Sequence, residues 1–307
     1  MVEFHHIPVM LEEVLDTLEP AEGKTYLDGT LGGGGHTGEL LRRGATVYGV
    51  DRDADALAAA TERLREYSAF HAIRGNFHDM KRLAEENAVP PLDGVLLDLG
   101  VSSFQLDTAE RGFSYHADAP LDMRMSQSGP TAADLVNTLS REELTRILRE
   151  YGEEPFAWAI AGKIEAAREK APIQTTLELA QIVASAVPPA IRRRDKNPAR
   201  RSFQALRIAV NGELDALNEG LDGIFDCLAP GGRFAIITFH SLEDRVVKNR
   251  FRQWATACTC PPEFPVCVCG GKAKAKLITR KPIEANAQEL EENRRSRSAK
   301  LRVVEKL

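Results

Sequence analysis

A glycine-rich bend between two short strand-like runs dominates the first fifty residues. Residues 26–31 lead into four consecutive glycines, Gly32 to Gly35, which are followed by an apolar helix start. A β-branched run from Thr46 to Val50 comes next and ends in Asp51. This succession of strand, glycine bend, helix and second strand ending in an acid is the sequence form of a βαβ unit that binds a nucleotide-like ligand.

Alternating strands and helices continue to about residue 100 and return near the C-terminus. Helices are predicted over residues 8–18 and 54–64, where apolar or alanine positions recur at helical spacing. Further strands are predicted at residues 69–74, 92–100, 233–239, 275–280 and 300–304. The pattern therefore indicates an α/β domain built from both ends of the chain.

In residues 131–189 apolar residues recur at helical spacing, and no strand pattern interrupts them. Capping boxes at Ser140-x-x-Glu143 and Thr175-x-x-Glu178 mark two helix starts. We predict an all-helical domain at residues 113–201, inserted into an α/β domain formed by residues 1–112 and 202–307. On returning to the α/β domain, residues 202–228 are expected to form one long helix or two.

Acidic and aromatic residues follow the ends of the predicted strands. Asp98 ends a strongly apolar strand, and in an open α/β sheet that end faces the ligand crevice. A carboxylate inside an apolar run needs a partner, so Asp98 is a stronger functional candidate than Asp51 alone. Asp51 is placed to accept hydrogen bonds from two ribose hydroxyls. Phe77 follows the third strand, where it fits either an adenine-stacking role or a core position.

The segment from Arg111 to Met125 has no clear period and mixes aromatics, methionines and charges. It is longer than the loops that compact domains usually carry without purpose. We therefore interpret it as a binding loop.

Composition indicates a globular protein. The chain has 307 residues, of which 43% are hydrophobic, enough to bury a full core. No run approaches the ~20 apolar residues of a membrane span. The first residues lack the basic start and apolar stretch of a secretory signal, so a cytoplasmic location is expected.

Charge is unevenly distributed along the chain. The formal net charge is −5, but residues 271–307 hold eleven Lys and Arg against five Glu, a surplus of six that leaves the other residues at −11. A second basic cluster comprises Arg192, Arg193, Arg194 and Lys196, with Arg200 and Arg201. Basic patches on an acidic body fit contact with a polyanion at defined places, and they also fit ordinary solvated loops.

Four of the five cysteines form two Cys-x-Cys pairs, Cys258 with Cys260 and Cys267 with Cys269. Without a secretory signal a disulfide framework is not expected. The pairs leave a structural zinc site open as an alternative, although zinc ligands are more commonly spaced C-x₂₋₄-C. The remaining cysteine, Cys227, fits a core position in an apolar helix.

Several longer motifs resemble the RsmH (MraW) family, over a stretch from His6 to the C-terminus. These motifs are Asp28-Gly-Thr-x-Gly-x-Gly-Gly-His36, Leu97-Asp-Leu-Gly-Val-Ser-Ser103, Gln105-Leu-Asp107, Arg111-Gly-Phe-Ser, Pro120-Leu-Asp-Met-Arg-Met125, Phe203-Gln-Ala-Leu-Arg207, Phe239-His-Ser-Leu-Glu-Asp-Arg245 and Arg297-Ser-Ala-Lys-Leu-Arg302. The resemblance implies a class I methyltransferase fold, with a mostly parallel seven-stranded sheet and an inserted helical domain. It also implies an enzyme that uses S-adenosyl-L-methionine to methylate the exocyclic N4 of one cytidine in the decoding region of small-subunit ribosomal RNA.

The resemblance assigns cofactor contacts residue by residue. Gly34, Gly35 and His36 match the glycine motif around the methionine part of the cofactor, Asp51 matches the acid at the ribose, and Phe77 matches the residue at the adenine. Asp98 and Gln105 match the remaining contacts. The chain departs from the family in having Phe104 where proline is common, which bears on the placement of Gln105.

The expected chemistry needs position and polar acceptors. The lone pair of cytosine N4 is delocalised into the ring, so the enzyme must align the nitrogen with the sulfonium methyl and accept hydrogen bonds from the amino protons. Candidate acceptors are Asp98, Ser102, Ser103 and His240, although His240 equally fits a hydrogen-bonded structural turn. We expect no metal, no covalent intermediate, and a target base that is flipped or presented from a loop.

Two other functions compete with this interpretation. Gly33, Gly35 and Gly38 satisfy G-x-G-x-x-G, which with Asp51 would also fit an NAD(P)-dependent oxidoreductase. A non-catalytic RNA-binding assembly factor on a methyltransferase scaffold would use the same basic segments. Expected partners are small-subunit ribosomal RNA or the assembling small subunit, without a membrane, and the sequence does not fix the oligomeric state.

Overall fold

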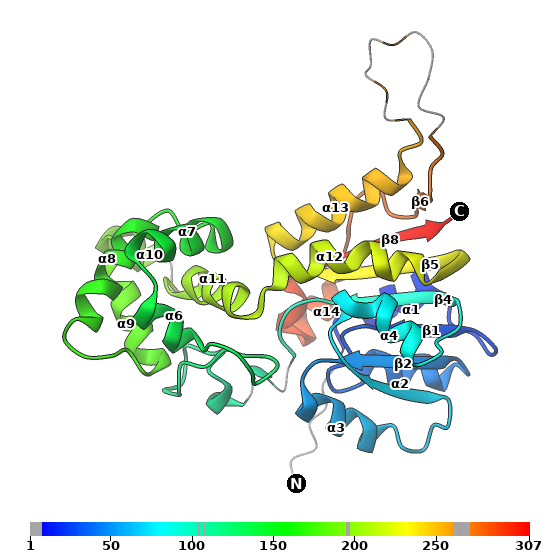
Figure 1. Ribbon diagram of the computed structural model, residues 1–307, viewed down its shortest axis with the longest axis horizontal. Coiled ribbons are helices and arrows are strands. Elements are labelled where there is room, and N and C mark those ends of the chain that lie inside the picture. Colours follow the sequence, from blue (N-terminus) through cyan, green and yellow to red (C-terminus); the bar gives the residue numbers. More distant parts are fainter. Residues whose placement is uncertain are drawn as a thin grey trace. The chain divides into compact units, whose positions relative to one another are not determined.

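The computed structural model describes residues 8–102, 105–106, 108–194, 197–258, 260, 264 and 271–307. The chain divides into two compact units (Figure 1). The main unit comprises Met1–Gly100 with Leu214–Leu307, and the inserted unit comprises Val101–Glu213.

The inserted unit is larger than the 113–201 expected from the sequence, because segments on both sides of that range join its core. Val101 and Leu106 pack against the helical core from the first side. On the second side, the helix that carries Phe203 and Leu206 buries both side chains in the same core. The predicted range 113–201 lies within the inserted unit, but residues 101–112 and 202–213, which we expected in the α/β domain, also belong to it.

A single sheet organises the main unit, in the order β3-β2-β1-β4-β5-β8-β6, with β7 paired to β8. The first five strands are mutually parallel, and β8 runs antiparallel to β5, β6 and β7. Their bounds are β1 (Thr25–Asp28), β2 (Thr46–Asp51), β3 (Phe70–Arg74), β4 (Leu92–Asp98), β5 (Leu228–Thr238), β6 (Ala275–Leu277), β7 (Ile283–Glu284) and β8 (Lys300–Lys306). The mostly parallel α/β fold is confirmed. The two-residue β7, too short to give a sequence pattern, raises the strand number above the seven expected.

Helices cover both faces of this sheet because its buried strands are apolar on both sides. In β4, Val95 and Leu97 point into one core cluster and Leu96 into the other. The first cluster is covered by α4 (Met80–Glu86), α12 (Glu213–Asp226) and α13 (Ser241–Ala255), and the second by α1 (Leu11–Leu18) and α2 (Gly35–Arg42). The remaining helical elements of the unit are α3 (Ala54–Arg63), α14 (Ala287–Glu292), and the 3₁₀ turns η1 (Phe77–Asp79) and η3 (Arg294–Ser298).

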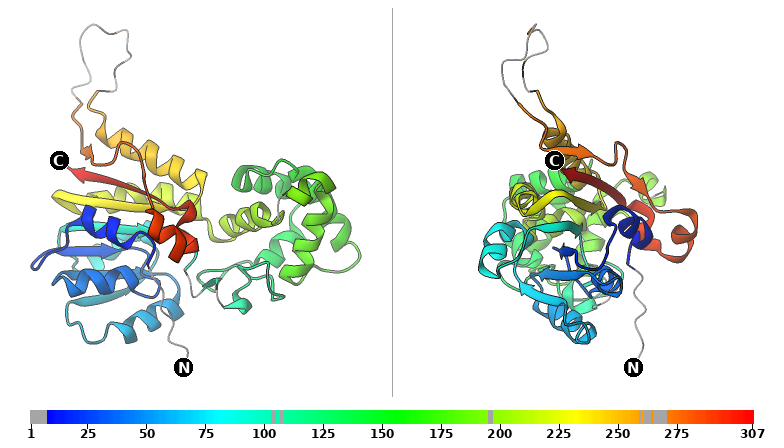
Figure 2. Two further views of the ribbon diagram at one scale, coloured as in Figure 1. Left: turned by 180° about the vertical axis from the view of Figure 1, so that it is seen from behind. Right: turned by 90° about the vertical axis from the view of Figure 1, so that its right-hand side faces the viewer.

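Helices α12 and α13 lie side by side on one face, as both views of the main unit show (Figures 1 and 2). The Trp254 ring stacks on Phe225 with centroids 4.2 Å apart, and its Nε1 donates a 2.9 Å hydrogen bond to Asp222 Oδ1. The indole thus buries its apolar body while its polar atom keeps a partner. This contact fixes the helix that begins at the end of β5.

The inserted unit is helical, as predicted. Its helices are α6 (Ala132–Thr138), α7 (Arg141–Gly152), α8 (Ala157–Arg168), α9 (Thr176–Ala186), α10 (Pro189–Arg194) and α11 (Arg200–Asn211), preceded by the turn η2 (Ala109–Arg111). The capping box at Ser140 is confirmed, because its hydroxyl accepts from Glu143 N–H while Glu143 accepts from Ser140 N–H. At Thr175 only the first half forms, since the Glu178 carboxylate instead accepts from Gln174 N–H.

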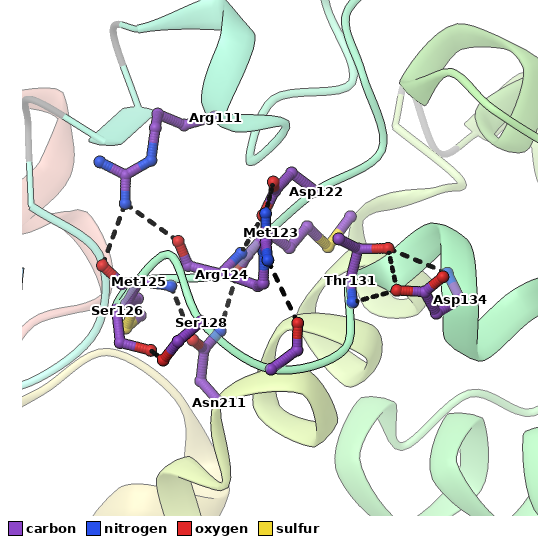
Figure 3. Close-up of polar contacts among 11 residues, drawn as sticks. Arg111, Asp122, Met123, Arg124, Met125, Ser126, Ser128, Thr131, Asp134 and Asn211 are labelled. Atoms are coloured by element: carbon purple, nitrogen blue, oxygen red, sulfur yellow. Dashed lines mark hydrogen bonds and ion pairs between the residues drawn. The ribbon is translucent and has the colours of Figure 1, made fainter.

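The segment interpreted as a binding loop is anchored within the inserted unit by polar side chains (Figure 3). Arg111 Nη2 donates to the carbonyl oxygens of Arg124 and Met125 at 2.9 and 3.0 Å. Asn211, near the end of α11, accepts from Met125 N–H and donates to the Met123 carbonyl oxygen, both at 2.8 Å. Met123 itself takes a left-handed φ of 64°. A left-handed non-glycine residue held by its surroundings is typical of functional segments.

Replacing Gly112 with alanine should destabilise the inserted unit by about 3 kcal/mol or more. Gly112 has φ 71°, and an added Cβ would lie 2.3 Å from the Pro120 carbonyl oxygen, a backbone atom that cannot rotate away. Gly129→Ala is the matched control, since Gly129 has φ 83° but no atom of the described part of the chain within 4 Å of an added Cβ. Urea unfolding of the two variants measures the difference. Equal losses would contradict the close packing of this loop.

Candidate active site

The glycine bend connects β1 to α2 and is tightly packed on one side. Gly32 and Gly34 take φ values of 51° and 72°, which glycine adopts without strain. An added Cβ at Gly34 would lie 2.9 Å from Leu64 Cδ1, and one at Gly35 would lie 2.7 Å from Pro8 Cγ. At Gly33, by contrast, no atom of the residues that the structure describes lies within 4 Å of an added Cβ. The bend is therefore held against the protein at Gly34 and Gly35 and open at Gly33.

Asp51 ends β2 and holds the bend in place. Its Oδ2 accepts a 2.8 Å hydrogen bond from Gly32 N–H, and its Oδ1 accepts one of the same length from Asp53 N–H. Burial raises the pKa of this carboxyl. Each carboxylate oxygen has a second lone pair, so Asp51 can orient the bend and still accept hydrogen bonds from a ligand.

Phe77 opens the turn η1 directly after β3. Its side chain is half-buried and packs against the core cluster under α4 and α12. An added Cβ on Gly29 would lie 3.4 Å from Phe77 Cβ, so Phe77 borders the end of β1. The side chain is thus a partly exposed apolar surface at the carboxyl edge of the sheet, compatible with both interpretations of Phe77.

Asp98 ends β4 beside the glycine bend. Its N–H donates a 2.6 Å hydrogen bond to Thr30 Oγ1, and its Oδ2 lies 3.9 Å from His36 Nδ1. Within the described part of the chain its Oδ1 is buried and has no hydrogen-bond partner. Burial raises the pKa of Asp98 to about 8, assisted by the nearby carboxylates of Asp28 and Glu243. This environment favours the protonated form of the carboxyl in the free protein.

His36 lies in the first turn of α2 as a neutral imidazole. Its Nε2 is 3.0 Å from the Val9 carbonyl oxygen, which accepts hydrogen bonds only, so Nε2 carries the hydrogen. The remaining nitrogen, Nδ1, therefore turns a lone pair toward Asp98. Burial lowers the pKa of His36 to about 4, so the ring stays uncharged at neutral pH.

Sequence reasoning did not single out Asp28, the last residue of β1. Its Oδ2 accepts from Thr37 Oγ1 at 2.8 Å, and its Oδ1 accepts from Thr30 N–H at 3.2 Å. The side chain is buried, which raises its pKa to about 6. The argument applied to Asp98, a carboxylate at the end of an apolar strand, would have found Asp28 as well.

His240 forms the N-cap of α13 through a capping box. Its Nδ1 accepts from Glu243 N–H at 3.4 Å, and Glu243 Oε2 accepts from the N–H groups of His240 and Phe239 at 3.3 and 2.9 Å. The hydrogen-bonded turn considered for His240 is therefore present. A catalytic role for the same side chain stays a prediction.

Ser102 and Gln105 belong to the inserted unit and bond to each other. Ser102 N–H donates to Gln105 Oε1 at 3.1 Å, and Gln105 N–H donates to Ser102 Oγ at 3.2 Å. Gln105 is buried. Ser103 and Phe104 lie outside the described residues, so their predicted roles stay predictions.

The residues that the structure describes contain no group of metal ligands and no helix that could span a membrane. Over residues 8–258 and 271–307, apart from the short gaps given earlier, no three His, Cys, Asp or Glu side chains gather as metal ligands. Two of the four clustered cysteines, Cys267 and Cys269, lie outside the described residues. In the same part of the chain no helix is long and apolar enough to cross a membrane.

Comparison with known proteins shows the family to which the chain belongs. The family model described as the MraW methylase family matches residues 3–307. The chain is 52% identical to "Ribosomal RNA small subunit methyltransferase H" of Lachnospira eligens, covering 100% of this chain and 99% of that protein. It is 54% identical to the protein of the same name from Anaeromyxobacter dehalogenans, with 99% of each covered.

Among solved structures, an rRNA methylase from Streptococcus thermophilus covers 98% of this chain at 12% identity and a TM-score of 0.44. This similarity is too low to support an inference about the site. The family model, in contrast, spans nearly the whole chain and includes the glycine bend, Asp51 and Asp98. The chain belongs to the MraW methylase family.

Proposed function

We propose that this protein transfers a methyl group from S-adenosyl-L-methionine to the exocyclic N4 of a cytidine in the decoding region of small-subunit ribosomal RNA. The supporting observation is the Asp98 carboxyl, which ends β4 beside the glycine bend with Oδ1 buried and without a hydrogen-bond partner among the described residues. A buried polar atom in that condition marks a place for a ligand or a reacting group. The names of the relatives support ribosomal RNA of the small subunit as the substrate.

The residues around the bend fit the proposed cofactor. The open backbone at Gly33 admits a ligand, Asp51 has lone pairs for ribose hydroxyls, and Phe77 offers an apolar surface for an adenine. The packed glycines Gly34 and Gly35 and the buried His36 shape the bend. When bound, S-adenosyl-L-methionine supplies a methyl group activated by a positively charged sulfur.

The protein's own contribution to the reaction is to position the amine and accept its hydrogens. An ionised Asp98 can accept hydrogen bonds from the cytosine amino group, which localises the nitrogen lone pair for attack. Ser102, Ser103, Gln105 and His240 remain proposed auxiliaries. The oxidoreductase alternative rested on G-x-G-x-x-G and Asp51, and both lie within the stretch that the methylase family model matches. The family assignment therefore leaves that alternative without support.

We propose that basic side chains of the inserted unit and of residues 271–307 bind the RNA. Arg192, Arg193 and Arg194 in α10 are exposed, as are Arg200 and Arg201 at the start of α11. Exposed guanidinium groups bind phosphates and give salt-dependent affinity. RNA of the assembling small subunit is the proposed partner, and a cytoplasmic location is expected with it.

Replacing Arg193 and Arg194 with alanine should weaken RNA binding and lower the dependence of log affinity on log salt by about 1.5–2. The measurement is a filter or fluorescence titration of a small-subunit RNA fragment at several salt concentrations. Arg146→Ala is the control, because Arg146 is also an exposed arginine of the inserted unit but is paired with Glu150 at 3.1 Å. An unchanged salt slope in the double variant would mean that other side chains bind the RNA.

The enzymatic proposal is tested by incubating the protein with methyl-labelled S-adenosyl-L-methionine and either immature or mature small subunits. Label in the RNA of one or both particles is expected, and the preferred particle identifies the stage of assembly. Absence of transfer to both, with RNA binding retained, would favour the non-catalytic assembly factor instead.

A further inference from the structure

We infer that Asp98, Asp28 and Glu243 form a carboxylate cluster that holds one proton in the free protein, releases it when a sulfonium binds, and takes one back from the amine that is methylated. This inference rests on the proposed function. It assigns Asp28 and Glu243, which have no role in the mechanism above, to tuning the charge of Asp98.

The three acids come from three elements and converge at the carboxyl edge of the sheet. Thr30 connects two of them, since its N–H donates to Asp28 Oδ1 at 3.2 Å and its Oγ1 accepts from Asp98 N–H at 2.6 Å. The third acid, Glu243, lies in the first turn of α13, where its Oε2 accepts from Phe239 N–H directly after β5, the strand that pairs with β4 up to Asp98. Its negative charge repels one on Asp98. Asp28 and Glu243 are 1% and 2% exposed, so water screens this repulsion poorly.

No positive charge of the described chain compensates Asp98. Its one ion-pair neighbour there is His36 Nδ1 at 3.9 Å, on a ring that is uncharged because burial lowers the pKa of His36 to about 4. The imidazole beside Glu243 is His240, with Nε2 3.1 Å from Glu243 Oε1. The Asp98 side chain is 24% exposed, so a ligand can approach it. When Asp98 is ionised, its negative charge thus has no positively charged partner within the described residues.

Such a carboxyl binds a proton until a cation arrives. Burial and the two neighbouring carboxylates raise the pKa of Asp98 to about 8, above neutrality. A positive charge a few ångströms away favours the ionised form, so binding of a sulfonium expels the proton. The neutral thioether that remains after methyl transfer does not oppose reprotonation.

The proton balance of methyl transfer closes on the same carboxyl. The amine nitrogen uses its lone pair to form the new N–C bond, while the electron pair of the broken S–C bond stays on sulfur. The nitrogen then carries one hydrogen too many, and the ionised Asp98 accepts it as a proton. The cluster returns to its starting charge, ready to exchange the neutral product for another cationic donor.

The test is isothermal titration of the full chain at about pH 7 in buffers with different ionisation enthalpies, using S-adenosylmethionine and S-adenosylhomocysteine as ligands. The slope of observed heat against buffer enthalpy gives the protons released. Wild type should release close to one proton more than Asp98→Asn with S-adenosylmethionine, and no more with S-adenosylhomocysteine. Subtracting the variant removes protons that come from the ligand's own amino group. At about pH 9.5, where Asp98 is already ionised, the difference should vanish.

Infrared difference spectra of wild type give a second measurement that does not depend on ligand binding by Asp98→Asn. The protonated-carboxyl band should disappear when S-adenosylmethionine is added and persist with S-adenosylhomocysteine. In Asp28→Asn, which can still accept the Thr37 hydrogen bond, this band should be lost at lower pH in the free protein. Binding of S-adenosylmethionine without proton release or band loss overturns this inference alone. Failure of wild type to bind S-adenosylmethionine overturns the proposed function and the inference together.

Discussion

Asp98→Ala is expected to reduce methyl transfer by about 10²–10³-fold while leaving the fold intact. The variant removes the carboxyl that faces the site but keeps the backbone N–H that bonds to Thr30 Oγ1. Because Asp98 Oδ1 has no hydrogen-bond partner in the described chain, little native structure depends on it. Transfer of labelled methyl groups to small-subunit RNA measures the loss, and circular dichroism with thermal unfolding checks the fold.

Asp93→Ala is the matched control, because Asp93 lies in the same strand at its opposite end. Asp93 Oδ2 accepts a 2.8 Å hydrogen bond from Thr25 N–H, so its loss should cost about 1 kcal/mol of stability and leave turnover near normal. Near-normal turnover in Asp98→Ala would mean that the reactive crevice lies elsewhere in the protein.

Asp51→Ala should weaken S-adenosylmethionine binding by about 100-fold. The substitution removes the acceptor for Gly32 N–H and Asp53 N–H, which loosens the bend, and it removes the proposed bonds to the ribose. Hydrogen bonds to a charged acceptor contribute about 1.5–3 kcal/mol each, and every 1.4 kcal/mol changes the dissociation constant about tenfold. Isothermal titration of the folded variant measures the change.

Asp55→Ala is the control for that experiment. Asp55 is an exposed acid in the first turn of α3, close in sequence to Asp51 but on the solvent side. Its substitution should change cofactor affinity by less than about twofold. If Asp51→Ala bound the cofactor as tightly as Asp55→Ala, the ribose contact and the anchoring role would both be wrong.

Predictions from the sequence were most accurate where a regular apolar pattern ends in an acid or begins with a helix-capping residue. The ends of β2 and β4 at Asp51 and Asp98, and the capping box at Ser140, all lie where the apolar pattern and local chemistry predict them. The division of residues 202–228 was left open as one helix or two. Gly212, with φ 58°, separates α11 from α12.

Tertiary contacts explain the features that local pattern did not predict. The inserted unit begins near residue 101 because isolated apolar residues before the predicted boundary, Val101 and Leu106, pack against a core formed by distant helices. Likewise, the neutral state of His36 depends on its burial, and its tautomer depends on the Val9 carbonyl oxygen, which no spacing in the sequence indicates. The raised pKa of Asp98 depends first on its burial and then on the carboxylates of Asp28 and Glu243, residues far apart along the chain.

The central claim is that this protein methylates the N4 amine of one cytidine in small-subunit ribosomal RNA. The most direct test is mass mapping of modified nucleosides in that RNA from cells with and without the protein, with rescue by wild type and by Asp98→Ala. We predict that one N4-methylated cytidine in the decoding region disappears without the protein and returns only with wild type. Persistence of that modification in cells lacking the protein, or its return with Asp98→Ala, would contradict the account.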